Sequence, residues 1–166
     1  MFEPKPLTKK AVPAAIERAE RYRLLNEPVE AESICRDVLR VDPDNREALR
    51  MLLLALTEQF DQRLNENFQP AKDLLERFDD EYSRLYYRGI ICERRAKCSL
   101  NRGGPGSGFL AYDWLRRAME CYEQAAEVRP AGNDDAILRW NTCGRIIDKF
   151  PEVQPAPEES TEPMLE

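Results

Sequence analysis

Apolar side chains recur along most of this chain at steps of three and four residues, which places them on one face of an α-helix. The strict alternation of apolar and polar residues that is typical of strands is absent. Segments that contain proline, glycine, aspartate or asparagine interrupt the pattern at residues 26–28, 42–45, 68–70, 101–108 and 131–134. The pattern therefore predicts an all-α fold.

Between these interruptions the spacing predicts a series of helices. The first has Pro13 in its opening turn, where the missing N–H of proline costs little. The third is expected to run on to Leu64, and the fourth to begin only after Pro70. Four of the chain's seven glycines lie between Asn101 and Gly108, so this segment must be a loop. The predicted helices cover residues 13–25, 29–39, 48–64, 71–78, 80–100, 109–128 and 136–147.

One set of residues repeats with fixed steps. In the first copy, Ala19 is followed at steps of 3, 9, 4, 3 and 5 by Tyr22, Ala31, Cys35, Val38 and Pro43. The second half of the set returns later at steps of 4, 3 and 5, as Ala118, Tyr122, Ala125 and Pro130. This spacing resembles the tetratricopeptide repeat, a helix–turn–helix unit of about 34 residues. The resemblance covers residues 12–148.

The middle of the chain follows the repeat less closely. The second unit is degenerate, because Ser83 stands where the repeat has a proline. The third unit carries an insertion, since the step from Cys92 to Ala118 is 26 residues where the first copy has 9. Both helices of the third unit are therefore expected to be longer than usual and to project past the stack.

The resemblance implies a right-handed α-solenoid of about three such hairpins, followed by a C-terminal capping helix. Residues 1–11 would be an N-terminal extension and residues 12–150 the helical domain. Residues 151–166 would form a disordered, acidic and proline-rich tail that adds little stability. The polar outer face of the capping helix is expected to carry Arg139, Arg145, Asp148 and Lys149.

Members of this family usually bind ligands in the concave groove that the first helix of each unit lines. The resemblance thus implies a non-catalytic scaffold that binds a protein or peptide, with Arg50, Tyr86 and Arg94 as anchors. The competing interpretation is that these positions form ordinary surface. Carried over by position, the groove would be lined by Ile16, Arg23, Arg50, Leu54, Tyr86, Ile90, Arg94, Ile137 and Asn141, with Glu20 and Thr57 beside them.

A second hypothesis is that the repeats mediate self-association, with the elongated third hairpin as the surface of a homodimer. A third function within the family is disfavoured. One subset clamps the terminal carboxylate of heat-shock chaperones with lysines and asparagines, and here Ile16, Glu20 and Met51 occupy the corresponding places.

Arginines recur along the helix predicted for residues 80–100. Arg84, Arg88, Arg95 and Arg102 follow one another at steps of 4, 7 and 7, which brings them to one helix face. They could form an anion-facing stripe for an acidic partner, including the chain's own tail. We favour the alternative of a solvated face, because exposed charges contribute little.

The charge of the chain is distributed unevenly. The net charge is −6, but residues 151–166 contain five glutamates and no basic residue, which leaves the remainder near neutral. A nucleic-acid partner is therefore not expected, because such proteins carry a clear basic surplus. No apolar run is long enough to cross a bilayer, and no signal-peptide core follows the first ten residues. We expect no membrane association and a cytoplasmic location.

The residue types present also argue against catalysis. The chain has no histidine, which removes the commonest general base and the commonest transition-metal ligand. The glycine-rich loop lacks the lysine of a phosphate-binding loop and follows a helix rather than a strand. The cysteines lie within helical patterns at no metal-binding spacing and are expected to be reduced, buried thiols: Cys35, Cys92, Cys98, Cys121 and Cys143. We expect neither an enzyme nor a bound cofactor or metal.

Overall fold

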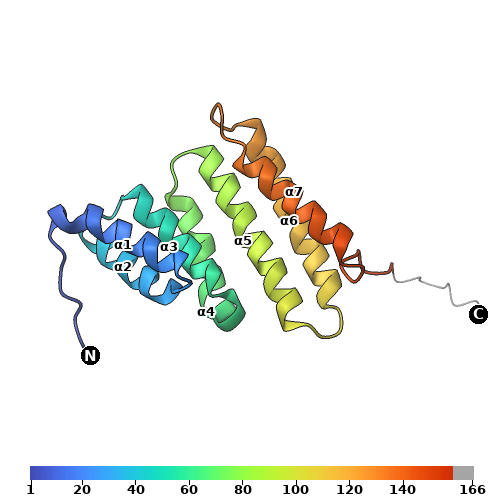
Figure 1. The fold of residues 1–166 in the computed structure, drawn as a ribbon, viewed down its shortest axis with the longest axis horizontal. Coiled ribbons are helices and arrows are strands. Elements are labelled where there is room, and N and C mark those ends of the chain that lie inside the picture. The colour runs from blue at the N-terminus through green and yellow to red at the C-terminus, as the bar shows by residue number, and fades with distance from the viewer. Residues whose placement is uncertain (159–166) are drawn as a thin grey trace, which may run out of the picture.

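The fold is all-helical, as the sequence predicts (Figure 1). The computed structural model describes residues 1–158, and within them it contains no strand. Two short 3-10 helices, η1 (Lys9–Ala11) and η2 (Leu74–Arg77), accompany the α-helices. The α-helices are α1 (Val12–Leu24), α2 (Pro28–Val41), α3 (Arg46–Glu58), α4 (Phe60–Asp73), α5 (Glu81–Arg102), α6 (Ser107–Glu127) and α7 (Asp135–Lys149).

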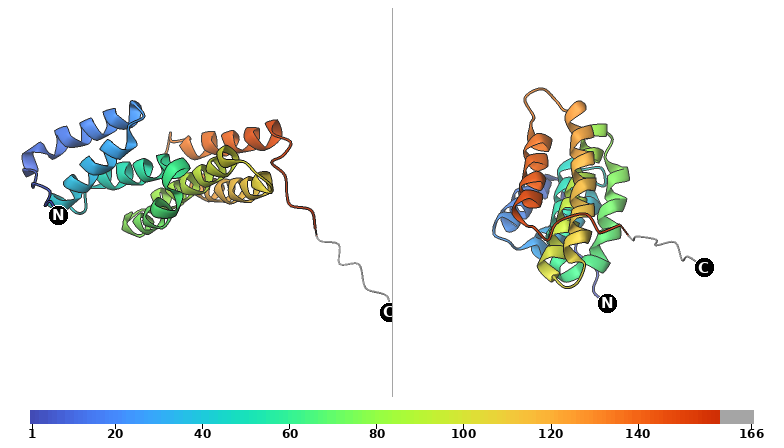
Figure 2. Two further views of the ribbon diagram at one scale, coloured as in Figure 1. Left: turned by 90° about the horizontal axis from the view of Figure 1, so that it is seen from below. Right: turned by 90° about the vertical axis from the view of Figure 1, so that its right-hand side faces the viewer.

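Each helix packs against the next one in the sequence, from α1 through to α7, and α3 also contacts both α1 and α5. The most extensive contact joins the two longest helices, α5 and α6. Figure 2 shows α1 and α7 raised on the same side of the molecule, with α3 and α5 lying lower between them. None of the helices in residues 1–158 is long and apolar enough to span a membrane.

Small residues let the long helices α5 and α6 approach closely. Ala118 and Ala125 of α6 are completely buried, and Gly89 of α5 faces the buried ring of Tyr122. A Cβ atom at Gly89 would lie only 2.7 Å from Cδ1 of Tyr122, so any larger residue would have to displace the ring. In the first hairpin, Ala31 is buried in the same way.

The second hairpin differs from the sequence prediction. Helix α3 ends at Glu58 rather than Leu64, because the backbone turns at Gln59, whose side-chain amide donates to the carbonyl of Ala55 at 3.0 Å. Helix α4 begins at Phe60, is kinked at Arg63, whose backbone is non-helical, and then continues through Pro70, where a break was expected.

Helix α4 tolerates its internal proline for two reasons. Leu64, Asn67 and Ala71 form a continuous buried face across this position, and the Asn67 amide donates to the Leu56 carbonyl of α3 at 3.1 Å. Pro70 itself is exposed, so water can satisfy the backbone carbonyl that loses its helical partner. The additional residues of this unit therefore fall between α3 and the regular part of α4, which follows the kink at Arg63.

The C-terminal segment also differs from the expectation. Val153 is only 3 % exposed and joins the main core, and its N–H donates to the Phe150 carbonyl at 2.9 Å. The backbone of Glu152 lies against Gly108, where an added Cβ would be 2.7 Å from the Glu152 carbonyl carbon. The first residues of the segment expected to be a disordered tail are thus packed against α6. Residues 159–166 of that tail lie outside the described residues.

The tight crossing of α5 and α6 predicts that a larger residue at Ala118 will destabilise the fold. The variant Ala118→Leu should lower the free energy of unfolding by about 1–3 kcal/mol, because the added atoms overpack a close helix contact. Thermal or denaturant melts followed by circular dichroism measure this. Gln124→Leu, at an exposed position of the same helix, is the matched control. Equal melts for both variants would contradict the described crossing.

The burial of Val153 predicts that the start of the C-terminal segment stabilises the domain. Val153→Ala should reduce the free energy of unfolding by roughly 1–2 kcal/mol, because it removes two buried methyl groups. Gln154→Ala, at the exposed neighbouring position, should have no measurable effect. If both variants unfold at the same temperature as the unchanged protein, this segment does not pack as described.

Candidate functional site

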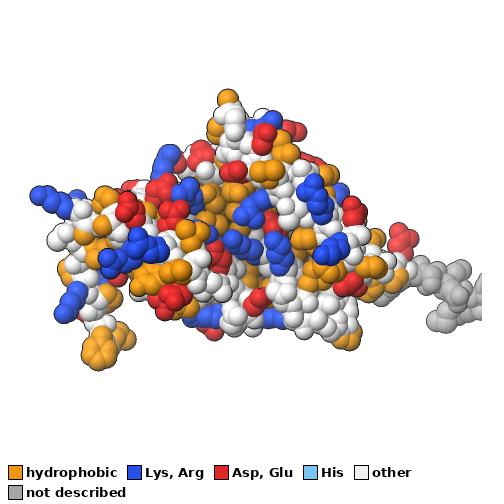
Figure 3. Space-filling view, viewed as in Figure 1, with side chains coloured by type: hydrophobic (Ala, Val, Ile, Leu, Met, Phe, Trp, Pro, Cys, Tyr) orange, Lys and Arg blue, Asp and Glu red, His pale blue; other side chains and the backbone are white. Residues whose placement is uncertain are grey.

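A cavity of about 260 Å³ opens on the face that α1, α3, α5 and α7 share. Figure 3 shows apolar and basic side chains gathered near the centre of this face. The structure brings six of the nine predicted groove residues together here: Arg23, Arg50, Leu54, Tyr86, Ile90 and Arg94. The same cavity is also lined by Glu20, Met51, Tyr87, Asp135 and Arg139. We call this site the arginine cavity.

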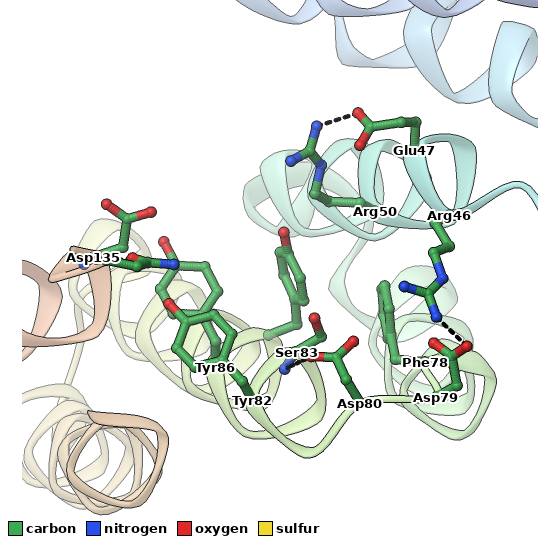
Figure 4. A pocket seen from close by; sticks show the side chains of 12 residues that line it. Arg46, Glu47, Arg50, Phe78, Asp79, Asp80, Tyr82, Ser83, Tyr86 and Asp135 are labelled. Carbon is green, nitrogen blue, oxygen red and sulfur yellow. Dashed lines mark hydrogen bonds and ion pairs between the residues drawn. The ribbon is translucent and has the colours of Figure 1, made fainter. Parts of the chain in front are cut away.

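A second cavity of about 270 Å³ adjoins the first and shares Arg50, Tyr86, Tyr87 and Asp135 with it. Figure 4 shows Arg50 of α3, Tyr82 and Tyr86 of α5 and Asp135 of α7 around this space. Its far end contains Asp79 and Asp80, where Asp80 caps α5 by accepting from the Ser83 N–H at 2.8 Å. The two cavities together form one groove, which is basic at one end and acidic at the other.

Arg94 forms part of the wall of the arginine cavity. Its Nη1 donates to the Leu54 carbonyl at 3.0 Å and to Oγ1 of Thr57 at 2.6 Å, and its Nη2 lies 3.6 Å from Glu58. Glu58 in turn accepts from Nε of Arg23 at 3.1 Å. Burial lowers the pKa of the Arg94 guanidinium. The negative charge of Glu58 raises this pKa, and the positive charges of Arg139 and Arg23 lower it further. Arg94 thus ties α5 to α3 and is not the freely accessible anchor that the sequence suggests.

Glu93 is a buried acid behind the arginine cavity, and sequence reasoning did not identify it. Its side chain is 1 % exposed. It accepts hydrogen bonds from Lys97 Nζ at 2.6 Å, Tyr122 Oη at 2.6 Å and Arg139 Nη1 at 3.1 Å. Burial alone would raise the pKa of the Glu93 carboxyl, but these donors together hold that pKa below its ordinary value. The only signal in the sequence is the four-residue step from Glu93 to Lys97.

Arg139 corrects one expectation about α7. The sequence placed it on the polar outer face, but its Nε donates to the Tyr86 hydroxyl at 3.0 Å and its Nη1 to buried Glu93. The guanidinium carbon also lies 5.9 Å from the centre of the Tyr86 ring. The neighbouring Leu138 is 62 % exposed instead. Arg139 therefore belongs to the arginine cavity, which no periodicity within α7 could reveal.

The other three predicted groove residues lie elsewhere. Ile16 packs against the core beneath α1, and Ile137 and Asn141 are half-buried on α7. Thr57 is buried and reaches the site only through its bond to Arg94. Within the described part of the chain, none of these side chains lines either cavity of the groove.

Two of the four arginines in the proposed stripe donate hydrogen bonds to other groups of the chain. Arg84 donates to the Phe78 carbonyl at 2.6 Å, and Arg95 donates to Ser99 Oγ at 2.6 Å. The Arg95 guanidinium also lies 5.7 Å from the ring centre of Trp114. The remaining two, Arg88 and Arg102, are exposed and line two different cavities. Two of the four arginines, Arg84 and Arg95, therefore form hydrogen bonds within the chain.

The groove supplies several donors for an anionic ligand. Each guanidinium carries five N–H donors, and the bonds above use only part of those on Arg23, Arg94 and Arg139. Arg50 is half-buried and pairs with Glu47 of its own helix. Within residues 1–158, no group of three or more cysteine, aspartate and glutamate side chains could hold a metal ion. The arrangement suits recognition of a charged, partly apolar ligand.

Comparison of the chain with protein-family models, with curated proteins and with solved structures found no match. The resemblance to the tetratricopeptide repeat therefore rests on the residue spacing of this chain. The functional argument rests on the geometry of the groove.

Proposed function

We propose that this chain is a non-catalytic scaffold that binds an acidic segment of a protein or peptide in the groove between α1, α3, α5 and α7. One observation carries the proposal: four arginines from four different helices surround a single cavity whose floor is partly apolar. Tyrosine and arginine carry much of the binding energy at protein interfaces, because both combine apolar area with hydrogen-bonding groups.

The proposal includes a tetratricopeptide-like architecture. The hairpins would be α1 with α2, α3 with α4, and α5 with α6, and α7 would cap a right-handed solenoid. Two observations support it: each helix packs on its successor, and the groove is lined by the first helix of each hairpin and by α7. Stacked hairpins of this kind present extended concave surfaces to their ligands.

The charges of the groove favour an acidic ligand at one end. Four arginines line the arginine cavity with Glu20 and Asp135, and each arginine also pairs with a neighbouring glutamate, so an acidic ligand would use the N–H donors that these pairs leave free. Met51 and Ile90 are only 2 % and 1 % exposed, so half-buried Leu54 is the side chain that offers apolar contact beside the acidic group. The adjoining cavity extends the groove, so an extended peptide could continue past Tyr86 toward the acidic end.

A non-catalytic role and a cytoplasmic location are part of the same proposal. Glu58 and Glu93, which pair with arginines of the cavity, already accept hydrogen bonds from basic side chains, which leaves them poorly suited as general bases. Free thiols at all five cysteines fit a reducing compartment. Self-association through the third hairpin finds less support, because its tip, residues 102–107, contains only arginine, glycine, proline and serine.

Selection of peptides tests the proposed groove directly. Panning a random-peptide library against the chain should enrich sequences that combine aspartate or glutamate with apolar residues. Arg50→Ala and Tyr86→Ala should each weaken binding of the selected peptides by roughly 1–2 kcal/mol or more, as measured by calorimetry. Binding should also weaken as salt is added, because the pairing of exposed charges is screened.

Arg116→Ala on α6 is the matched control, because this arginine is exposed and, within the described residues, its side chain hydrogen-bonds to Met119 of the same helix alone. Circular dichroism and light scattering should show that the variants remain helical and have the same mass in solution. Peptides that bind Arg50→Ala as tightly as the unchanged chain, but fail to bind Arg116→Ala, would place the ligand outside the groove. A concentration-dependent dimer whose formation competes with the peptides would favour self-association.

A further inference from the structure

A third cavity, of about 310 Å³, lies between α4, η2, α5 and α6 and takes no part in the groove. Its wall is mostly apolar, and Phe68, Leu75, Ile91 and Trp114 contribute to it. Two cysteines open onto this same space, Cys92 from α5 and Cys121 from α6. Arg88, Arg117 and Lys72 supply positive charge around it, against the single carboxylate of Glu120.

The two thiols are neighbours across the packed α5–α6 interface, where both line this cavity. Interaction with Cys92 lowers the pKa of the Cys121 thiol, and the positive charge of Arg88 acts in the same direction. Interaction with Cys121, together with burial, raises the pKa of the Cys92 thiol. Cys121 is half-buried and Cys92 is 8 % exposed, so an attacking reagent reaches Cys121 first.

The other three cysteines are more deeply buried and do not line this cavity. Cys35, Cys98 and Cys143 are at most 1 % exposed. Burial raises the pKa of both Cys35 and Cys143 to about 12, and it also raises the pKa of Cys98. The Cys98 thiol donates to the Phe60 carbonyl at 3.2 Å. These three thiols are therefore structural groups that solvent and oxidants reach only when the fold opens.

We propose that Cys92 and Cys121 form a redox-active dithiol, which a small peroxide converts into a disulfide that bridges α5 and α6. The cavity admits the oxidant, both thiols line it from the packed helices α5 and α6, and Arg88 stabilises an anionic sulfur on Cys121. Reduced thiols that form a disulfide only under oxidation are typical of redox-sensing pairs in reducing compartments.

The reaction would proceed in two balanced steps. The Cys121 thiolate attacks one oxygen of hydrogen peroxide, the O–O bond breaks, and the products are a sulfenic acid on Cys121 and hydroxide. The sulfur of Cys92 then attacks the Cys121 sulfur, its proton passes to the departing hydroxyl, and water leaves. The hydroxide from the first step takes up the proton that Cys121 released when it ionised. In sum, two thiols and one peroxide yield one disulfide and two waters, and the peroxide is the oxidant consumed.

Peptide mapping of the native chain tests this proposal. The reduced protein is treated with limiting hydrogen peroxide, alkylated with iodoacetamide, digested with trypsin and analysed by mass spectrometry. We expect alkylation of Cys92 and Cys121 to fall together, and a disulfide to join the tryptic peptides 89–94 and 118–139 within one chain. Dithiothreitol should restore both sites. Alkylation of Cys35, Cys98 and Cys143 should not change with peroxide.

Single substitutions distinguish the thiol that attacks peroxide, Cys121, from the thiol that closes the bridge, Cys92. In Cys92→Ser the bridge cannot form, so the sulfenic acid on Cys121 should accumulate and be trapped by dimedone. In Cys121→Ser the remaining Cys92 should stay reduced at the same peroxide dose. Cys98→Ser is the control and should form the bridge as the unchanged chain does. Two results would overturn the proposal: no linked peptide in the native chain, or a Cys121 that peroxide leaves as reduced as the buried three.

Discussion

The hydrogen bond from the Tyr122 hydroxyl to the buried carboxylate of Glu93 is the contact on which the C-terminal half of the structure depends. The Tyr122 ring occupies the space that Gly89 leaves open, so α5 and α6 can pack closely. A carboxylate without solvent is stable only when donors surround it, and Lys97 and Arg139 complete that set. Because Arg139 belongs to α7, one buried acid joins three helices and also fixes an arginine over the groove.

The groove follows from this contact and from a second ion-pair network on its other side. Glu58 of α3 accepts from Arg23 of α1 and lies near Arg94 of α5, so this network joins α1, α3 and α5. The guanidiniums around the arginine cavity are thereby ordered before any ligand arrives. A ligand that pairs with them need not bear the entropic cost of arranging long side chains, which favours tight recognition of an anionic group. The Cys92–Cys121 pair lies on the other side of α5, directly next to Glu93 and Tyr122 in sequence.

The sequence predicted the helical fold best where local signals were strong. Asp80 caps α5, the glycine-rich segment separates α5 from α6, and Asn133 accepts from the backbone at the start of α7. The prediction was wrong around Pro70, because the buried face of α4 outweighed the local preference of proline. Six of the nine predicted groove residues line one cavity, whereas Arg139 and Glu93 depend on which helices meet in space, and no local pattern encodes that.

The central claim is that a ligand binds in the groove formed by α1, α3, α5 and α7. Backbone amide NMR of the labelled chain, titrated with a selected acidic peptide, measures this most directly. The account predicts that the largest shift changes fall around Arg23, Arg50, Tyr86 and Asp135, with small changes on α2, α4 and the outer face of α6. Changes that concentrate on α4 and α6 instead, with the groove amides unmoved, would contradict it.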